Sequence, residues 1–194
     1  MDSSSRFYER AAPLLGMTPS AYRAGAEGQT IRCASASTPL GRVLVAATAK
    51  GVCSVSLGDS ERALLTSLRS EFPKAAIVRA AGDVRDWLAR VVAHVNGRLP
   101  QLDLPLDIRA TAFQWQVWNA LRTIPPGETR TYRQVADAIG RPSAARAVAR
   151  ACASNPVALA VPCHRVVPSA GGSGGYRWGE ARKARLIARE RSVS

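Results

Sequence analysis

The chain has 194 residues, of which 46% are hydrophobic and 21% are charged, so it can bury a sizeable core and its composition excludes wholesale disorder. Its net charge is +13, and residues 111–194 contribute +9 of this, from 13 basic and 4 acidic side chains. A basic half of this kind indicates a polyanionic partner, with nucleic acid as the first candidate. No apolar run approaches the roughly 20 residues that cross a bilayer, and no signal peptide opens the chain, so we expect a cytoplasmic protein without a membrane partner.

The four cysteines and two histidines show no paired CxxC spacing. This pattern argues against a zinc ribbon and against a disulfide framework. We therefore expect four reduced thiols and no metal or other cofactor.

The chain is predicted to start with a small appendage and a sheet. Residues 1–28 hold a Ser-rich stretch, a short helical pattern and a linker with two glycines, which is too little for a domain. Short β-branched runs between residues 30 and 57 are separated by turn signals at 38–41 and 50–51. They predict three antiparallel strands joined by tight turns.

Two helices and a connector are expected next. Asp59 and Ser60 are good N-cap candidates for a helix whose apolar residues recur at helical spacing until Pro73. Residues 84–95 fit a second helix, which Asn96-Gly97 would close. Residues 101–109 contain Pro105 and are predicted to be an extended connector.

The second half is predicted to be mainly helical. Phe113, Val117 and Leu121 share one helix face, and the helix should end at residues 125–127 (Pro-Pro-Gly). Thr131 should cap a helix through residue 139, and Ser143 a helix through about residue 153, with a Gly-containing turn between them. This is the form of a helix-turn-helix. Residues 171–175 form a Gly-rich loop that we expect to be mobile, and residues 182–190 form a last helix.

The second helix of this pair carries two arginines, Arg146 and Arg150, four residues apart and therefore on one face. Its many alanines would allow a close approach to a partner. A helix-turn-helix pattern is only moderately specific, and a packed helical pair with two solvated arginines is the plainer interpretation.

The segment Pro162-Cys163-His164-Arg165-Val166 places a thiol beside an imidazole and a guanidinium. Such neighbours can activate a thiol, whose free pKa of about 8.5 leaves little thiolate at neutral pH. Adjacent residues of an extended segment point to opposite sides, so a turn or a bridging water would have to carry the proton from Cys163 to His164. A carboxylate could orient the imidazole. The candidates in this half are Glu128, Asp137, Glu180 and Glu190, and the spacing does not choose among them.

Seven motifs together resemble the O6-alkylguanine-DNA alkyltransferases. The resemblance covers about residues 30–190, and within the family it points to the C-terminal part of the Ada-type adaptive-response protein. Residues 15–23 resemble the end of an AraC-like module, which predicts that the chain is a fragment or a shortened version of such a regulator. The motifs are Phe113-Gln114-Trp115-Gln116-Val117-Trp118, Ile124-Pro125-Pro126-Gly127-Glu128-Thr129, Tyr132, Arg146-Ala147-Val148, Asn155-Pro156, the segment 162–166, and Gly175-Tyr176-Arg177-Trp178-Gly179.

The resemblance implies a role for each matching residue. Cys163 would accept the alkyl group, His164 would take its proton through a water molecule, and Glu190 would orient His164. Asn155 would buttress the active-site turn, and Tyr132 would help to rotate the nucleotide and protonate the departing guanine. Arg146 would fill the gap left by the flipped base. The implied DNA contacts are Tyr132, Arg146, Ala147, Arg150 and Arg165, and the implied pocket residues are Val166, Tyr176, Arg177 and Trp178, the last two narrowing the pocket towards methyl.

The expected architecture is an α/β protein in two parts. Residues 29–108 would form a small antiparallel three-stranded sheet with helices, resembling a ribonuclease-H-like fold. Residues 109–194 would form a helical domain with a winged-helix-like helix-turn-helix, and residues 1–28 would be the AraC-like remnant and linker.

The expected function is single-turnover methyl transfer from O6-methylguanine, and more weakly from O4-methylthymine, in double-stranded DNA to Cys163. The protein would act as a monomer and flip the damaged base. A helix-turn-helix regulator fragment without chemistry is one alternative. A cysteine hydrolase is a weaker one, since it leaves the basic half and Arg146 unexplained.

Overall fold

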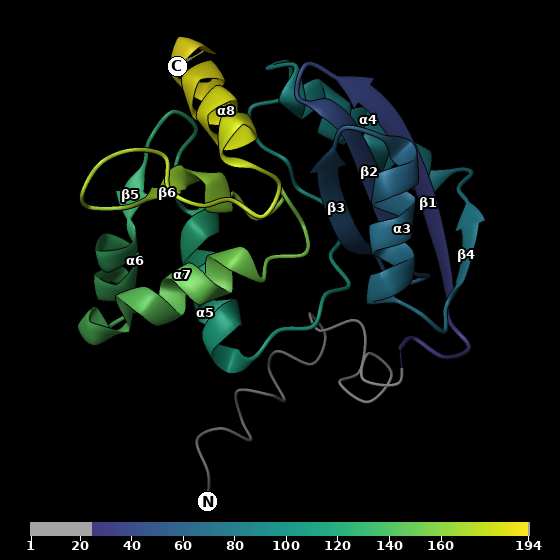
Figure 1. Ribbon diagram of the computed structural model, residues 1–194, viewed down its shortest axis with the longest axis horizontal. Coiled ribbons are helices and arrows are strands. Elements are labelled where there is room, and N and C mark those ends of the chain that lie inside the picture. The colour runs from purple at the N-terminus through teal and green to yellow at the C-terminus, as the bar shows by residue number, and fades with distance from the viewer. Residues whose placement is uncertain (1–24, 194) are drawn as a thin grey trace, which may run out of the picture.

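The computed structural model describes residues 25–193, which form two halves joined near residue 110 (Figure 1). The predicted remnant of an AraC-like module lies almost wholly outside the described residues. No helix in the described part of the chain has the length and apolar character to cross a membrane.

The N-terminal half is built on one mixed sheet. Strands β1 (Thr30–Thr38), β2 (Gly41–Ala47) and β3 (Val52–Gly58) pair antiparallel, which confirms the three predicted strands. A fourth strand, β4 (Ala76–Arg79), pairs parallel to β1 and gives the order β3-β2-β1-β4. The prediction of only three strands is therefore wrong, because the four residues of β4 are too few to show a strand pattern and form their pairs with a strand over 40 positions away.

Two helices cover the two faces of this sheet (Figure 1). Helix α3 (Glu61–Glu71), capped by Ser60, packs on the face that includes Ile31 and Leu44. Helix α4 (Asp83–Val95) packs on the opposite face, against Val43 and Val45. Both helices bury the leucines and valines that recur at helical spacing, as the sequence pattern predicts.

The outer edge of β3 holds the second half of the chain in place. The backbone N–H of Val52 donates to the carbonyl of Pro105 at 2.7 Å, so the connector runs along this edge. Further along, the N–H of Val55 donates to Pro156 at 3.0 Å and its carbonyl accepts from Ala158 at 2.9 Å. The segment before Cys163 is thus fastened to the sheet of the N-terminal half, and one apolar cluster extends through both halves.

The C-terminal half contains the predicted helix-turn-helix. Helix α5 (Ala112–Arg122) precedes it, and a two-stranded parallel pair, β5 (Arg130–Thr131) with β6 (Val166–Val167), lies beside it. Thr131 caps α6 (Tyr132–Ala138) as predicted, through a capping box with Gln134. The remaining elements are the 3-10 turn η1 (Pro142–Ala144), α7 (Ala145–Ala153), the 3-10 turn η2 (Cys163–Arg165) and α8 (Glu180–Val193).

Ser143 does not cap α7, contrary to the prediction. It lies within the 3-10 turn η1, and α7 begins after Ala144 with no side-chain cap. Pro142 at the start of that turn fixes its backbone dihedral, so the chain turns once before the α-helix begins.

Candidate active site

Asn155 fastens the turn that leads to Cys163. This side chain is fully buried, and its Nδ2 donates to the carbonyl of Val161 at 2.9 Å. Its Oδ1 accepts from the backbone N–H of Val157 at 2.9 Å. Leu159, inside this turn, has a φ of 70°, a conformation that costs a residue other than glycine on the order of 1–3 kcal/mol. The hydrogen bonds of Asn155 thus link both ends of the strained turn.

Cys163 lies at the start of the 3-10 turn η2 and is 3% exposed. Its Sγ accepts a hydrogen bond from Nδ2 of Asn155 at 3.2 Å. Burial raises the pKa of the thiol to about 11, although the Asn155 hydrogen bond and the positive charges of Lys183 and Arg177 oppose this rise. The resting thiol is therefore protonated at neutral pH.

The thiol opens into a cavity of about 330 Å³ that α6, α7 and the loop before α8 enclose. Tyr132 comes from the first turn of α6, and Cys152 from the buried face of α7. Burial raises the pKa of Tyr132, so its hydroxyl is protonated at neutral pH. The cavity is lined by Tyr132, Ala149, Cys152, Ala153, Cys163, Gly175, Tyr176 and Arg177.

His164 is fully buried and is oriented by Glu190. Its Nε2 lies 2.8 Å from Oε1 of Glu190, which comes from the last helix, α8. Of the four carboxylates that the sequence left open, the structure brings Glu190 to the imidazole. Burial lowers the pKa of His164 despite the hydrogen bond and charge of Glu190, so the ring is neutral at neutral pH.

A neutral ring that donates through Nε2 leaves Nδ1 as a proton acceptor. Nδ1 is buried and has no hydrogen-bond partner within the described part of the chain. Residues 163 and 164 lie in the 3-10 turn η2 and not in an extended segment, so a turn, one of the two arrangements that the sequence left open, is present here.

Arg165 faces the interior, so the expectation that it contacts DNA is wrong. It is 6% exposed, and its Nη2 donates to Oε1 of Glu190 at 2.8 Å. Its Nη1 donates to the carbonyl of Ile124 at 2.6 Å. Burial opposes ionisation of Glu190, but the hydrogen bonds from His164 and Arg165 outweigh it and lower the pKa of the carboxyl. Arg165 therefore keeps Glu190 ionised and in position for His164.

Lys183 is a residue of the site that the sequence analysis overlooked. It is 1% exposed, and its Nζ donates to the carbonyl of Val166 at 2.6 Å and to that of Gly175 at 3.3 Å. It thus ties the strand after Cys163 to the loop that carries Tyr176. A sequence signal existed, because Lys183 lies three residues before the buried Leu186 and shares its helix face.

The four expected pocket residues occupy different positions. Tyr176 lines the cavity of Cys163, and its buried hydroxyl has no partner in the part of the chain that is described. Trp178 packs edge-on against Tyr176, with ring centroids 5.0 Å apart, and is buried behind it. Val166 contributes the carbonyl that Lys183 holds. Arg177 turns towards α3, where its Nη2 lies 3.4 Å from Oε2 of Glu71.

The exposed face of α7 carries the two arginines of the helix-turn-helix. Val148, Ala151 and Cys152 are buried, while Arg146 and Arg150 are exposed and Ala147 is half-buried. Nε1 of Trp118 in α5 donates to the carbonyl of Ala151 at 2.9 Å, which fixes α7 with this face outward. Neither arginine forms an ion pair within residues 25–193. Both guanidinium groups are free to meet an anion beside the cavity.

Comparison with known proteins agrees with this geometry. Residues 112–192 match the family model described as the DNA-binding domain of 6-O-methylguanine DNA methyltransferase. The methylated-DNA–protein-cysteine methyltransferase of Mycobacterium leprae is 34% identical over 161 residues, which cover 83% of this chain and 93% of that protein. The chain belongs to the methylated-DNA–protein-cysteine methyltransferase family.

One further relative and one solved structure are also similar to this chain. The bifunctional transcriptional activator/DNA repair enzyme Ada of Escherichia coli is 50% identical over 187 residues, which are 96% of this chain and 53% of Ada. The chain therefore spans about half the length of this relative. The crystal structure of Mycobacterium tuberculosis OGT in complex with DNA superposes with a TM-score of 0.70 at 34% identity and covers 84% of this chain and 94% of that one.

These matches confirm the resemblance that the seven motifs predict, and they confirm an α/β fold with a small sheet and helices. For this member of the methyltransferase family, the matched range 112–192 contains Cys163, His164, Glu190, Asn155 and Tyr132. The family model thus covers the whole of the geometry around the thiol.

Proposed function

We propose that the chain repairs double-stranded DNA by transferring the methyl group of O6-methylguanine, and more weakly that of O4-methylthymine, to Cys163. The observation that carries this proposal is a buried thiol at a cavity walled by the helix-turn-helix, next in sequence to a buried histidine that Glu190 orients. A methyl group on a base edge lies inside the duplex, so the nucleotide would have to rotate out to reach the cavity.

The transfer proceeds in one displacement. The thiol proton passes to Nδ1 of His164 through a water molecule, and Glu190 stabilises the resulting imidazolium. Sγ then attacks the methyl carbon, so that an S–C bond forms and the C–O6 bond breaks. The electron pair remains on the guanine, which takes a proton from the hydroxyl of Tyr132. The product thioether is not hydrolysed, so each molecule acts once.

In this proposal, the exposed arginines of α7 contact the DNA. Arg146 fills the space that the rotated nucleotide leaves, and Arg150 and Ala147 lie against the groove with it. Tyr132 crowds the phosphate of the target nucleotide and thereby favours its rotation. Tyr176, with Trp178 behind it, forms the wall against which the base rests.

The finer architecture belongs to the same proposal. The mixed sheet with β4 parallel to β1 supports a ribonuclease-H-like fold for residues 29–108, and the β5–β6 pair beside the helix-turn-helix supports a winged-helix-like unit in residues 109–194. We further propose that the protein acts as a monomer in the cytoplasm.

The test is a stoichiometric reaction with a duplex that carries one O6-methylguanine. Peptide mass analysis should find one methyl group on the peptide that contains Cys163, and one guanine restored per protein molecule. Cys163→Ser should bind the duplex without repairing it, whereas Cys152→Ser should still accept the methyl group. DNA binding with an unmodified Cys163 and an unrepaired base would refute the proposal and favour a regulator without chemistry.

A further inference from the structure

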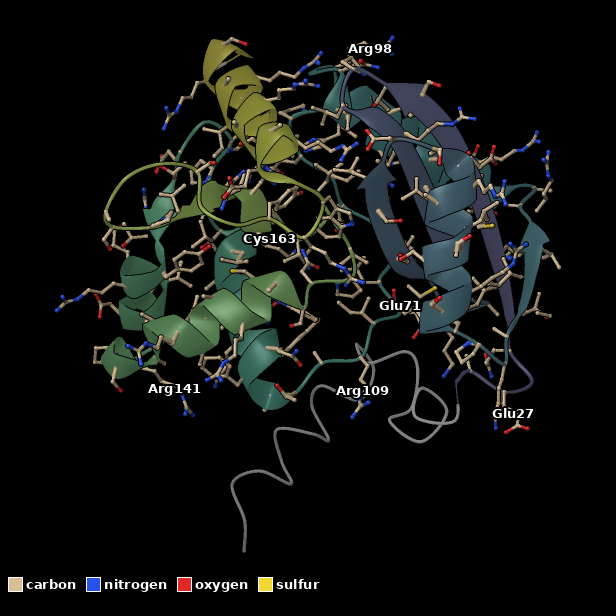
Figure 2. All side chains as sticks on the ribbon, in the orientation of Figure 1. Glu27, Glu71, Arg98, Arg109, Arg141 and Cys163 are labelled. Carbon is tan, nitrogen blue, oxygen red and sulfur yellow. The ribbon has the colours of Figure 1, made fainter. Side chains whose placement is uncertain are left out.

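Arg177 connects the N-terminal half of the chain to the active-site turn. Its Nη2 lies 3.4 Å from Oε2 of Glu71, at the end of α3, and its Nη1 donates to the carbonyl of Asn155 at 3.3 Å. In Figure 2, Glu71 lies between α3 and the half that carries Cys163. One guanidinium thus touches a carboxylate of the first half and the backbone of the residue that holds the thiol.

The same arginine lies at the border of two cavities. It lines the cavity of Cys163, and it lines a larger cavity of about 620 Å³ between the two halves, to which Glu71 and Asp107 also contribute. Its guanidinium lies 5.8 Å from the ring centroid of Trp178, behind the pocket wall. Arg177 therefore borders both the cavity of the thiol and the ring behind its wall.

The contacts of Asn155 carry this connection to sulfur. While the carbonyl of Asn155 accepts from Arg177, its Nδ2 donates to Sγ of Cys163 at 3.2 Å. The positive charge of Arg177 also lowers the pKa of Cys163, although burial dominates and raises it. Both effects require the guanidinium to stay near the turn, and Glu71 is the anion that holds it there.

We propose that Glu71, Arg177 and the carbonyl of Asn155 form a latch through which the N-terminal half positions Arg177 and so sets the reactivity of Cys163. The proposal rests on the proposed function, because it assigns Arg177 as a positioning residue of the same reaction. Within the described residues, the N-terminal half contributes no side chain to the cavity of Cys163. The latch would nevertheless let this half influence the chemistry.

The direction in which Glu71→Gln changes the ease of thiolate formation distinguishes this latch from a simple charge effect. Glu71→Gln removes a negative charge, and by Coulomb's law alone this would make the thiolate easier to form. In the latch, the same change releases Arg177, whose side chain is 37% exposed, to solvent. The thiolate then loses its nearby positive charge and becomes harder to form.

The other groups that face the thiol are the same in wild type and variant. Lys183 of α8, Cys152 of α7, Tyr132 of α6, Tyr176 of the loop before α8, and His164 in η2 all lie near Cys163. A change in reactivity on Glu71→Gln is therefore assigned to Arg177.

The experiment measures methylation of Cys163 by methyl iodide, with peptide mass analysis, at several pH values between about 7 and 9, where the rate follows the thiolate fraction. Glu71→Gln should lower the rate about two- to fivefold, the size expected for a partly exposed ion pair. Arg177→Met should lower it at least as much, and the double variant should show no further loss, because the two residues act as one unit.

Asp59→Asn is the matched control. Arg182 also links the segment after Cys163 to the N-terminal half, through Asp59 and the carbonyl of Leu40, but it does not touch Asn155. Loss of the Arg182–Asp59 ion pair in Asp59→Asn should leave the rate of Cys163 methylation unchanged. An unchanged or raised rate for Glu71→Gln, or an equal loss for Asp59→Asn, would overturn the latch.

A parallel assay with methylated duplex keeps the two proposals apart. In one outcome, the wild type takes no methyl group from DNA, but Glu71→Gln still lowers the rate at which methyl iodide methylates Cys163. The proposed function then fails and the latch stands. If wild type repairs DNA and Glu71→Gln repairs it at the same rate as Asp59→Asn, the latch fails and the proposed function stands.

Discussion

Replacing Glu190 by Gln should destabilise the protein far more than its position near the C-terminal end of the chain suggests. The carboxylate is 12% exposed and accepts hydrogen bonds from His164, from Arg165 and from the backbone N–H of Gly127 at 3.2 Å. Gln keeps the shape but removes the charge, which leaves the buried guanidinium of Arg165 without an anion. Removing one partner of a buried ion pair costs about 3–5 kcal/mol, and we expect about 3 because the amide oxygen can still accept.

This loss is measurable by urea unfolding followed by circular dichroism, and by thermal unfolding. For a chain of this length, about 3 kcal/mol lowers the midpoint of thermal unfolding by about 6–12 °C. Asp103→Asn is the control, because the pair of Asp103 with Arg122 is exposed and should be worth less than about 1 kcal/mol. A free energy of unfolding for Glu190→Gln within about 0.5 kcal/mol of wild type would refute the reasoning.

The pH dependence provides a second check on the same residue. The pKa of Glu190 is lowered in the folded state, so its contribution to stability is complete above the unfolded value of about 4.3 and is lost as the pH falls below it. The difference in stability between wild type and Glu190→Gln should therefore be largest near neutral pH and shrink below about pH 4. A difference that stays constant down to acid pH would show that the carboxylate charge is not what stabilises the fold.

Three further predictions concern the turn, the helix cap and an exposed arginine of α7. Asn155→Ala should cost about 2–3 kcal/mol in urea unfolding, because it leaves buried backbone groups of the turn without partners, and it should slow alkylation of Cys163 by removing a hydrogen bond to the thiolate. Thr131→Ala should cost about 1 kcal/mol by loss of the capping box, whereas Ser143→Ala should stay within about 0.5. Arg146→Ala should weaken duplex binding and reduce the slope of log affinity against log salt by about 1, while Arg62→Ala on the exposed face of α3 should change neither. If Arg146→Ala and Arg62→Ala changed duplex binding equally, α7 would not be the DNA-binding helix.

Local signals were enough to predict most of the elements. The β-branched runs of β1 to β3 and the capping box at Thr131 depend on residues close together in the chain, and the structure has them where the patterns place them. Strand β4 and the true start of α7 were not predictable in this way. The first is defined by parallel pairing with β1, and the second by a 3-10 turn whose sequence resembles a helix cap.

The site depended on contacts that spacing does not reveal. Glu190 lies 26 residues from His164, and three other carboxylates in this half were equally acceptable until the motif resemblance and then the structure singled it out. Arg165 was expected to contact DNA, but its guanidinium pairs with the buried carboxylate of Glu190 and lies in the interior. Its inward position is a consequence of tertiary structure, as is the burial of Lys183.

The burial of Cys163 also bears on the single use of the thiol in the proposed reaction. With its pKa raised to about 11 by burial, Cys163 is almost entirely protonated at pH 7, so a passing electrophile meets an unreactive thiol. The same exclusion of water strengthens the attraction between a thiolate and the donors around it, namely Asn155, Lys183 and Arg177. Selectivity in the proposed reaction then comes from placement rather than from a low pKa, because a methyl carbon held in the cavity gains an effective concentration that no dissolved reagent reaches. In the proposed reaction, Cys163 is therefore methylated by the alkyl group that fits the cavity.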